Sequence, residues 1–409
     1  MTLPSEPTGP RAALRVAAYR RWFLAQIFSA SGTSTQLVGM SWLVVQRTDS
    51  GIALGALTAA IFLPVLLVGP WAGQVIDRVD RRVLLMGTQI AFFVIGAVLV
   101  VVTWVGADSL PVLYAVALAT GIVNAFDGPA RQVYLMDVLP RPMLQAAIGL
   151  YEVVQNGARV LGPAVAGALL ATGSVLPCFI FNALAFLPAL YALVRNRHAT
   201  SHAVIVTADS RSHGMWSGLR WSFTHRSILV TMVLASVSGM LFNLAVTIPV
   251  IATHVFDLGG GGYGLLLAVF GGGALLGAFR AATQHGAPRY ARITVLALIT
   301  GALTVITAFA PTSWALAIGL FIVGATSIWF ITRANTLVQL EAPPALRGRV
   351  MSVWNMAIPG MNPITGLAAG VAIDLVGPRA GLALPGILFV VIAAAALIIA
   401  RTRRSGSAR

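Results

Sequence analysis

Four charged side chains lie within long apolar runs, at spacings that could carry a proton through a membrane. Asp127 precedes Arg131 by four residues and Glu152 precedes Arg159 by seven, so each pair falls on one face of a helix. Charges within hydrocarbon are costly, and they usually mark the path of an ion or a substrate. A buried carboxylate beside a second one can hold a proton near neutral pH.

We therefore predict proton coupling at Asp127, Arg131, Glu152 and Arg159. Asp127 and Arg131 are expected to form an ion pair. Glu152 is expected to join them in one acid–base–acid cluster near the cytoplasmic opening of the transport path. A static network that joins the two helices is the alternative.

A dense group of charges follows the second apolar run. Between positions 73 and 82 the sequence reads G-Q-V-I-D-R-V-D-R-R, with two acids and three Arg within six residues. These charges must form a short aqueous turn between two spans. Gly73 would let two helices approach closely, and Asp77 could accept hydrogen bonds from the N-terminus of a neighbouring helix or pair with an Arg. The alternative is that Arg81 and Arg82 only orient the chain in the membrane.

The composition is that of a membrane protein. Of 409 residues, 58% are hydrophobic and 10% are charged, whereas soluble domains have about 25% charged residues. At about 20 residues a span, we predict an all-α integral membrane protein. Its twelve spans are expected near 22–46, 52–76, 83–105, 110–134, 145–172, 175–195, 228–254, 261–283, 290–310, 312–337, 347–376 and 380–400.

The basic residues are distributed unequally between the two sides. The net charge is +15, and all 27 basic residues are Arg. Along the predicted spans, twenty-one Arg fall on the side of the termini, and two, Arg47 and Arg379, fall on the other. This is the positive-inside pattern, so both termini are expected in the cytoplasm and the number of spans should be even. The Arg residues form no groove-lining patch with interleaved aromatics, so no nucleic acid is expected.

Residue types exclude several kinds of chemistry. Without Lys the chain has no G-x-x-x-x-G-K-[ST] phosphate loop and no Schiff-base lysine. The one cysteine, Cys178, forbids an internal disulfide. None of the six His has the H-E-x-x-H spacing of a metalloprotease. We expect no cofactor, no metal and no enzymatic activity. If the protein is a transporter, it must therefore use an ion gradient or let its substrate move down the substrate's own concentration gradient.

The longest connection divides six predicted spans from six. Its second part places Met215, Trp216, Leu219 and Phe223 at the spacing of an amphipathic helix on the inner leaflet; a disordered basic linker is the alternative. We predict a cytoplasmic tail at 1–21, an N-terminal six-helix bundle at 22–195, a linker with an amphipathic helix at 196–226, a C-terminal six-helix bundle at 227–400 and a cytoplasmic tail at 401–409.

Short matches recur between the two halves. The run S-A-S-G at 29–32 corresponds to S-V-S-G at 236–239, and Arg131 corresponds to Arg333. Such matches suggest a duplicated six-span unit with parallel halves. In the second half, Arg333 and Glu341 are expected to form the corresponding ion pair.

Several motifs carry a resemblance to a known family. The spacing G-x-x-x-D-R-x-x-R-R begins at Gly73, the run N-A-F-D-G-P-A-R ends at Arg131, and G-P-x-x-x-G begins at Gly162. With R-G-R at 347–349, these motifs resemble the major facilitator superfamily over about residues 15–400. They are similar to the branch of the enterobactin exporter, transmembrane secretion effectors and drug-efflux facilitators. The resemblance implies twelve helices in two pseudo-symmetric six-helix bundles.

The resemblance also implies roles for residues. The turn after the second span would be a latch to the eleventh span that holds the outward-facing state, made of Gly73, Asp77, Arg78, Arg81 and Arg82. The helix-packing motif would be Gly162, Pro163 and Gly167. Spans one, four, seven and ten would line a polar, nearly uncharged cavity, in which aromatic rings could stack on a ligand. The alternative is that these rings contact lipid or pack between helices. The cavity candidates are Gln26, Ser29, Gln36, Met40, Asn124, Asn156, Ser236, Phe242, Asn243, Trp329, Arg333, Trp354 and Asn355.

One feature departs from the drug–proton antiporters of this superfamily, which usually carry R-x-x-x-G early in span four. No Arg occurs between Leu110 and Gly121. Asp127 or Glu152 is therefore the expected proton carrier.

We predict a proton-coupled exporter of bulky organic compounds, such as drugs, siderophores or natural products, that works by alternating access. It would be a multi-pass protein of the bacterial inner membrane and functional as a monomer. Its expected partners are the lipid bilayer, a small-molecule substrate and protons. An importer or uniporter of a small organic solute, or a non-transporting sensor, is the alternative.

Overall fold

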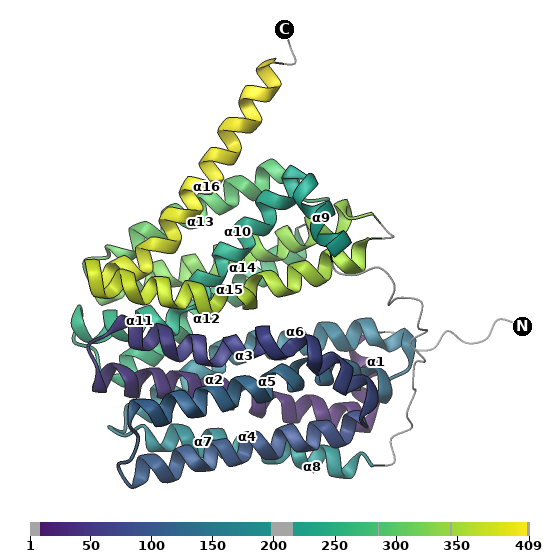
Figure 1. Cartoon of the computed structure of the whole chain (residues 1–409), viewed down its shortest axis with the longest axis vertical. Helices are drawn as coiled ribbons and strands as arrows, with labels where there is room; N and C mark the ends of the chain where they lie inside the picture. The colour runs from purple at the N-terminus through teal and green to yellow at the C-terminus, as the bar shows by residue number, and fades with distance from the viewer. Residues whose placement is uncertain (1–8, 198–215, 285, 344–345, 407–409) are drawn as a thin grey trace, which may run out of the picture. The chain divides into compact units, whose positions relative to one another are not determined.

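The computed structural model describes residues 9–197, 216–284, 286–343 and 346–406, and within these ranges the chain forms helices and no strands (Figure 1). The helices of the first half are α1 (Pro10–Arg15), α2 (Ala17–Arg47), α3 (Gly51–Arg78), α4 (Arg81–Trp104), α5 (Leu110–Val138), α6 (Arg141–Leu170), α7 (Leu176–Ala185) and α8 (Leu187–Arg195). The helices of the second half are α9 (Trp216–Thr224), α10 (Arg226–Phe242), α11 (Leu244–His254), α12 (Gly260–Thr283), α13 (Tyr290–Ala308), α14 (Ser313–Glu341), α15 (Arg347–Val376) and α16 (Pro378–Gly406).

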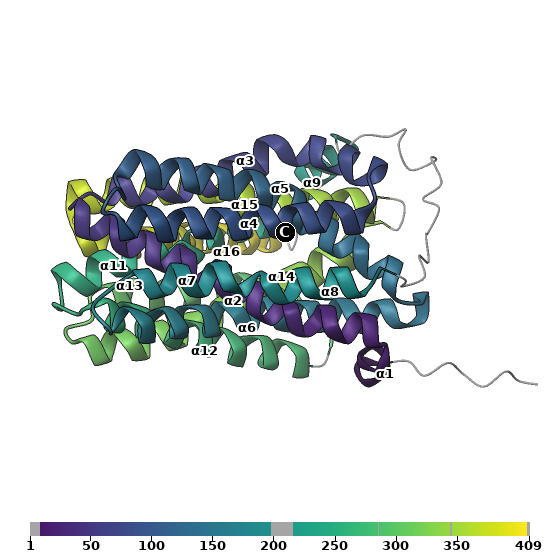
Figure 2. The ribbon, with the colours of Figure 1, turned by 90° about the horizontal axis from the view of Figure 1, so that it is seen from below.

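The helices account for the twelve predicted spans. Nine segments of the described chain are long and apolar enough to cross a membrane. Two of these join α7 with α8 and α10 with α11, and α7 and α8 follow one line in Figures 1 and 2. Three more helices complete the twelve. Helices α2 and α6 have 31 and 30 residues but more polar side chains, and α15 has 30 residues and contains the apolar segment Gly360–Val376. The predicted all-α membrane fold is confirmed.

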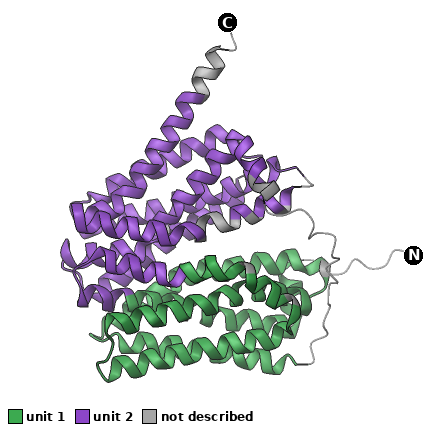
Figure 3. Cartoon of the chain, viewed as in Figure 1, with its two compact units in different colours: residues 1–40, 63–207 green, residues 41–62, 208–409 purple. Residues whose placement is uncertain are grey.

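The chain divides into two compact units (Figure 3). Unit 1 comprises Met1–Met40 and Leu63–Thr207, and unit 2 comprises Ser41–Phe62 and Ala208–Arg409. The division at 207/208 lies inside the predicted linker, and α9 occupies the place of the predicted amphipathic helix. The predicted N-terminal bundle, residues 22–195, differs from unit 1 in one segment. Residues 41–62 precede the linker but pack in unit 2.

Aromatic contacts anchor the core of each unit. In unit 1, Trp22 of α2 meets Tyr134 of α5 edge-on, with ring centroids 5.2 Å apart. In unit 2, Phe330 of α14 meets Phe389 of α16 in the same way at 5.5 Å. All four side chains are buried. Their edge-to-face geometry stabilises each core beyond the burial of apolar surface alone.

Glycines allow α12 and α14 to touch backbone to backbone. A Cβ atom at Gly273 would overlap the carbonyl oxygen of Phe321, and one at Gly277 would overlap that of Ala325. A Cβ at the neighbouring Gly272 would meet only the Phe321 ring, at 3.7 Å. Small residues at such crossings permit the close packing that joins helices in membranes.

We expect Gly273→Ala to lower the free energy of unfolding by about 1–3 kcal/mol, because the added methyl group displaces the backbone of α14. Gly272→Ala is the matched control and should raise it by about 0.5–1 kcal/mol, because Ala is favoured over Gly inside a helix and the added methyl group has room. Thermal unfolding of the purified protein in detergent measures both. Equal unfolding temperatures for the two variants would contradict this account of the crossing.

Candidate functional site

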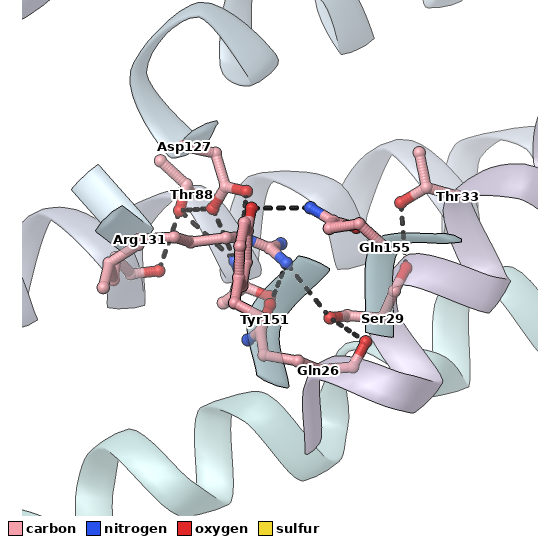
Figure 4. A network of polar contacts seen from close by, with 10 residues as sticks. Gln26, Ser29, Thr33, Thr88, Asp127, Arg131, Tyr151 and Gln155 are labelled. Atoms are coloured by element: carbon pink, nitrogen blue, oxygen red, sulfur yellow. Dashed lines mark hydrogen bonds and ion pairs between the residues drawn. The ribbon is translucent and has the colours of Figure 1, made fainter. Parts of the chain in front are cut away.

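A buried ion pair lies in the interior of unit 1. Nε of Arg131 contacts Oδ2 of Asp127 one turn earlier on α5 (Figure 4). The two residues are 5% and 3% exposed. Because both charges are withdrawn from water, each depends on the other and on the polar groups of neighbouring helices.

Helix α4 supplies donors to the carboxylate. Oδ1 of Asp127 accepts hydrogen bonds from Oγ1 of Thr88 and from Nε2 of Gln89, each at 2.7 Å. Together with Arg131, these residues occupy both carboxylate oxygens. Sequence reasoning missed Thr88 and Gln89, although two adjacent polar residues inside an apolar span are a visible signal.

Helix α2 supplies acceptors to the guanidinium. Nη1 of Arg131 contacts Oε1 of Gln26 and lies 3.4 Å from Oγ of Ser29. Both side chains are buried, so these two cavity candidates serve the ion pair inside unit 1. Among the described residues, Nε2 of Gln26 and Oε1 of Gln89 have no hydrogen-bond partner, and such buried polar atoms are sites where water binds.

Helix α6 completes the network with residues that were not predicted. Tyr151 and Gln155 lie next to Arg131 in Figure 4, and Nε2 of Gln155 donates to Oη of Tyr151 at 2.5 Å. Helices α2, α4, α5 and α6 therefore meet at one cluster of polar side chains. We call the set Gln26, Ser29, Thr88, Gln89, Asp127, Arg131, Tyr151 and Gln155 the unit 1 network.

The structure does not place Glu152 in the unit 1 network. Adjacent residues of a helix point about 100° apart, so Tyr151 faces α5 while Glu152 turns away and is exposed. The charge that acts on Glu152 is that of Arg159, two turns along α6 and also exposed. Asn156 lies between them, half-buried, and its Nδ2 donates to the Glu152 carbonyl at 2.9 Å. Exposed charges within a span usually face water inside the protein.

The other two cavity candidates of α2, Gln36 and Met40, are buried as well. Nε2 of Gln36 lies 3.2 Å from Oγ1 of Thr120 on α5 and 3.6 Å from Sδ of Met40. Gln36 and Met40 therefore fill the interior of unit 1. Asn124 of α5 is half-buried.

In unit 2, Asn243 lies at the break between α10 and α11. Its Nδ2 donates to Oγ1 of Thr365 at 2.7 Å and to the carbonyl of Asn362 at 3.2 Å, which ties the break to α15. Trp354 is 3% exposed and belongs to the core. Ser236 is half-buried and donates to a carbonyl of its own helix. The side chains of the remaining two candidates of this region, Phe242 and Asn355, lie outside the described residues.

Arg333 and Glu341 do not pair, contrary to the prediction. Arg333 donates to the carbonyl oxygens of Gln284 and Gly286 at 3.3 and 2.9 Å, in the turn after α12. Glu341 accepts a hydrogen bond from Ser227 at 2.9 Å. The two residues are eight positions apart on α14, and each finds a nearer partner on another element.

Trp329 lies beside Arg333 at this end of unit 2. Its indole nitrogen donates to Oε1 of Gln284 at 2.9 Å, and the Arg280 guanidinium lies 5.1 Å from the ring centroid. Trp329 is half-buried, so these contacts hold it between α12 and α14.

The charged turn between α3 and α4 is bound to unit 1. Nη1 of Arg81 lies 2.5 Å from Oδ1 of Asp137 on α5, and Nε of Arg82 donates to the Leu193 carbonyl of α8 at 2.6 Å. Asp80 caps the N-terminus of α4. Arg81 and Arg82 thus join three helices as well as contributing charge.

The other residues of the expected latch lie on the last turns of α3. Gly73 and Arg78 are exposed, and a Cβ at Gly73 would meet nothing within 4 Å. The side chain of Asp77 lies outside the described residues.

The expected packing motif brings α6 against α2. A Cβ at Gly162 would overlap Ser34, and Oγ1 of Thr35 donates to the Gly162 carbonyl at 3.1 Å. Pro163 and Gly167 follow on α6 and are buried.

We expect Arg131→Ala to lower the free energy of unfolding by about 3–5 kcal/mol, because it leaves the buried Asp127 charge without its partner. The double variant Asp127→Asn with Arg131→Gln removes both charges and should lose less than Arg131→Ala. A thermal double-mutant cycle in detergent, with Asp127→Asn and Arg131→Gln as the two single variants, measures the coupling between the two residues. Additive losses would show that the pair is not coupled.

Three comparisons place the chain among known proteins. The family model for transmembrane secretion effectors matches residues 8–407. The staphyloferrin A transporter of Staphylococcus aureus is 26% identical over 222 residues, which are 54% of this chain and 55% of that protein. The multidrug efflux pump Tap of Mycobacterium tuberculosis is 27% identical over 384 residues, 88% of this chain and 89% of that pump.

Solved structures share the fold. A bacterial homologue of the human lysosomal transporter Spinster superposes with a TM-score of 0.72 at 15% identity, over 95% of this chain and 97% of that one. At this identity the likeness supports the fold alone. The match to the family model covers nearly all of the sequence. The chain therefore belongs to the transmembrane secretion effector family and is a membrane transporter of the major facilitator superfamily.

Proposed function

We propose that this transporter exports bulky organic compounds and is driven by the proton gradient. Its relatives include a multidrug efflux pump and a siderophore transporter, and drugs and siderophores are bulky organic compounds. The observation that carries the coupling is the contrast between two acid–Arg pairs of unit 1. One pair is buried in the unit 1 network, and the other is exposed on α6.

Glu152 is the better proton carrier of the two acids. It is exposed and can exchange a proton with water, and when ionised it attracts Arg159. Protonation of Glu152 would end that attraction and so change the balance of charge along α6. Asp127 is enclosed by Arg131, Thr88 and Gln89, so it serves as a fixed anchor for α2, α4 and α5.

We also propose that both termini lie in the cytoplasm of a bacterial cell. The Arg distribution along the predicted spans supports this orientation, with twenty-one Arg on the side of the termini and two on the other.

We expect Glu152→Gln to abolish proton-driven uptake of substrate by everted membrane vesicles and to make any residual transport insensitive to pH. Glu341→Gln is the matched control, since Glu341 is an exposed acid at the end of α14 whose carboxylate accepts a hydrogen bond from Ser227. The substrate is chosen from a panel of antibiotics and siderophores tested against a pump-deleted host, with and without a protonophore. Unchanged proton-dependent uptake in Glu152→Gln would remove Glu152 as the carrier. Uptake that ignores the protonophore would indicate a uniporter.

A further inference from the structure

Within unit 2, a carboxylate of one helix caps the beginning of another. Asp374 lies two residues before the end of α15. Its Oδ1 accepts from the Gly51 backbone N–H at 2.5 Å, and its Oδ2 accepts from the Ile52 N–H at 3.1 Å and from Oγ of Ser50 at 2.8 Å. The first N–H groups of α3 have no partner within their own helix, and a negative charge is favoured at this end.

The two helices cross beside this cap through glycines. A Cβ atom at Gly51 would lie 2.7 Å from the carbonyl oxygen of Gly370, and one at Gly55 would lie 2.6 Å from that of Gly366. Both helices thus present the G-x-x-x-G spacing that lets backbones touch in membranes. The cap and the crossing together bind the start of α3 to the end of α15.

Two further contacts hold the end of α2 and the turn before α3. Nε2 of His254, the last residue of α11, lies 3.1 Å from Oδ1 of Asp49. The ring of Trp42 stacks on that of Tyr263 in α12, with centroids 6.1 Å apart. Residues 41–62 are therefore attached to α11, α12 and α15.

Helices α2 and α3 nevertheless continue into unit 1, at 40/41 and at 62/63. Pro64 follows at once in α3 and has no N–H for the helical ladder. Any change in the arrangement of the two units must therefore bend α2 and α3 or detach 41–62 from unit 2.

We propose that Asp374 is a positioning residue of the transport cycle, whose cap on α3 stabilises one transport state and is released in the other. The proposal rests on the alternating access of the proposed function.

Thr58 provides a reporter for release of the cap. It is 3% exposed and packs against Gly366, where a Cβ would lie 3.2 Å from Thr58 Cβ. We place Thr58→Cys in a Cys178→Ala background and measure its reaction with a water-soluble maleimide in the purified full-length protein. Asp374→Ala should raise the labelling rate by about two- to thirtyfold, the range expected when a helix loses its side-chain cap. Asp374→Glu, which keeps the charge, should restore much of the protection.

Two controls separate release of the cap from unfolding. Asp257→Asn changes an exposed acid of unit 2 that adopts a positive φ, which Asn tolerates, and should leave labelling of the Thr58→Cys protein unchanged. Native Cys178 is fully buried in unit 1, so it should stay unlabelled when Asp374→Ala is made in the natural sequence.

Equal labelling with and without Asp374→Ala, or labelling of Cys178 as well, would overturn the proposal. The assay needs neither substrate nor a proton gradient, so its result is independent of the vesicle experiment. In the vesicles, Asp374→Ala should lower the maximal rate of transport more than the apparent affinity for substrate.

Discussion

The ion pair between Asp127 and Arg131 is the interaction on which the rest of unit 1 depends. An isolated charge in a low-dielectric interior is too costly to keep, so its compensation must be built from the surrounding helices. Thr88 and Gln89 of α4 satisfy the acid, and Gln26 and Ser29 of α2 satisfy the base. If α2 or α4 moved away, the Arg131 guanidinium or the Asp127 carboxylate would lose its hydrogen-bond partners. The ion pair therefore requires α2, α4 and α5 to move as one body.

The same requirement appears in other helices. Oε1 of Gln26 on α2 accepts from Arg131, the Gly162 carbonyl of α6 accepts from Thr35, and the Asp374 carboxylate of α15 accepts from the start of α3. Lipid-facing helices have no such duty and can be apolar throughout. Polar contacts nevertheless join apolar spans as well, since Thr88 and Gln89 lie on α4 and bind Asp127 of α5.

The sequence predicts the spans well because lipid leaves helices as the only way for single segments to satisfy their backbone. It also predicts the Asp127–Arg131 pair, since one helical turn fixes that geometry locally. It does not predict which neighbour a side chain faces. Gln26 and Ser29 were assigned to a cavity and serve Arg131 instead, and Arg333 binds carbonyl groups of the α12–α13 turn instead of Glu341. Asp374 and Gly51 are 323 residues apart, so no local pattern connects them.

The assignment of residues 41–62 to unit 2 bears on how the protein is assembled during synthesis. The ribosome produces residues 41–62 long before it produces α15. Until then, Gly51 and Gly55 lie in the bilayer without the contacts that they later make with Gly370 and Gly366. A gene split at the central linker would give a C-terminal fragment whose glycine face meets lipid tails where it should meet a helix. Such a fragment would need the N-terminal fragment in the same membrane in order to complete its own packing.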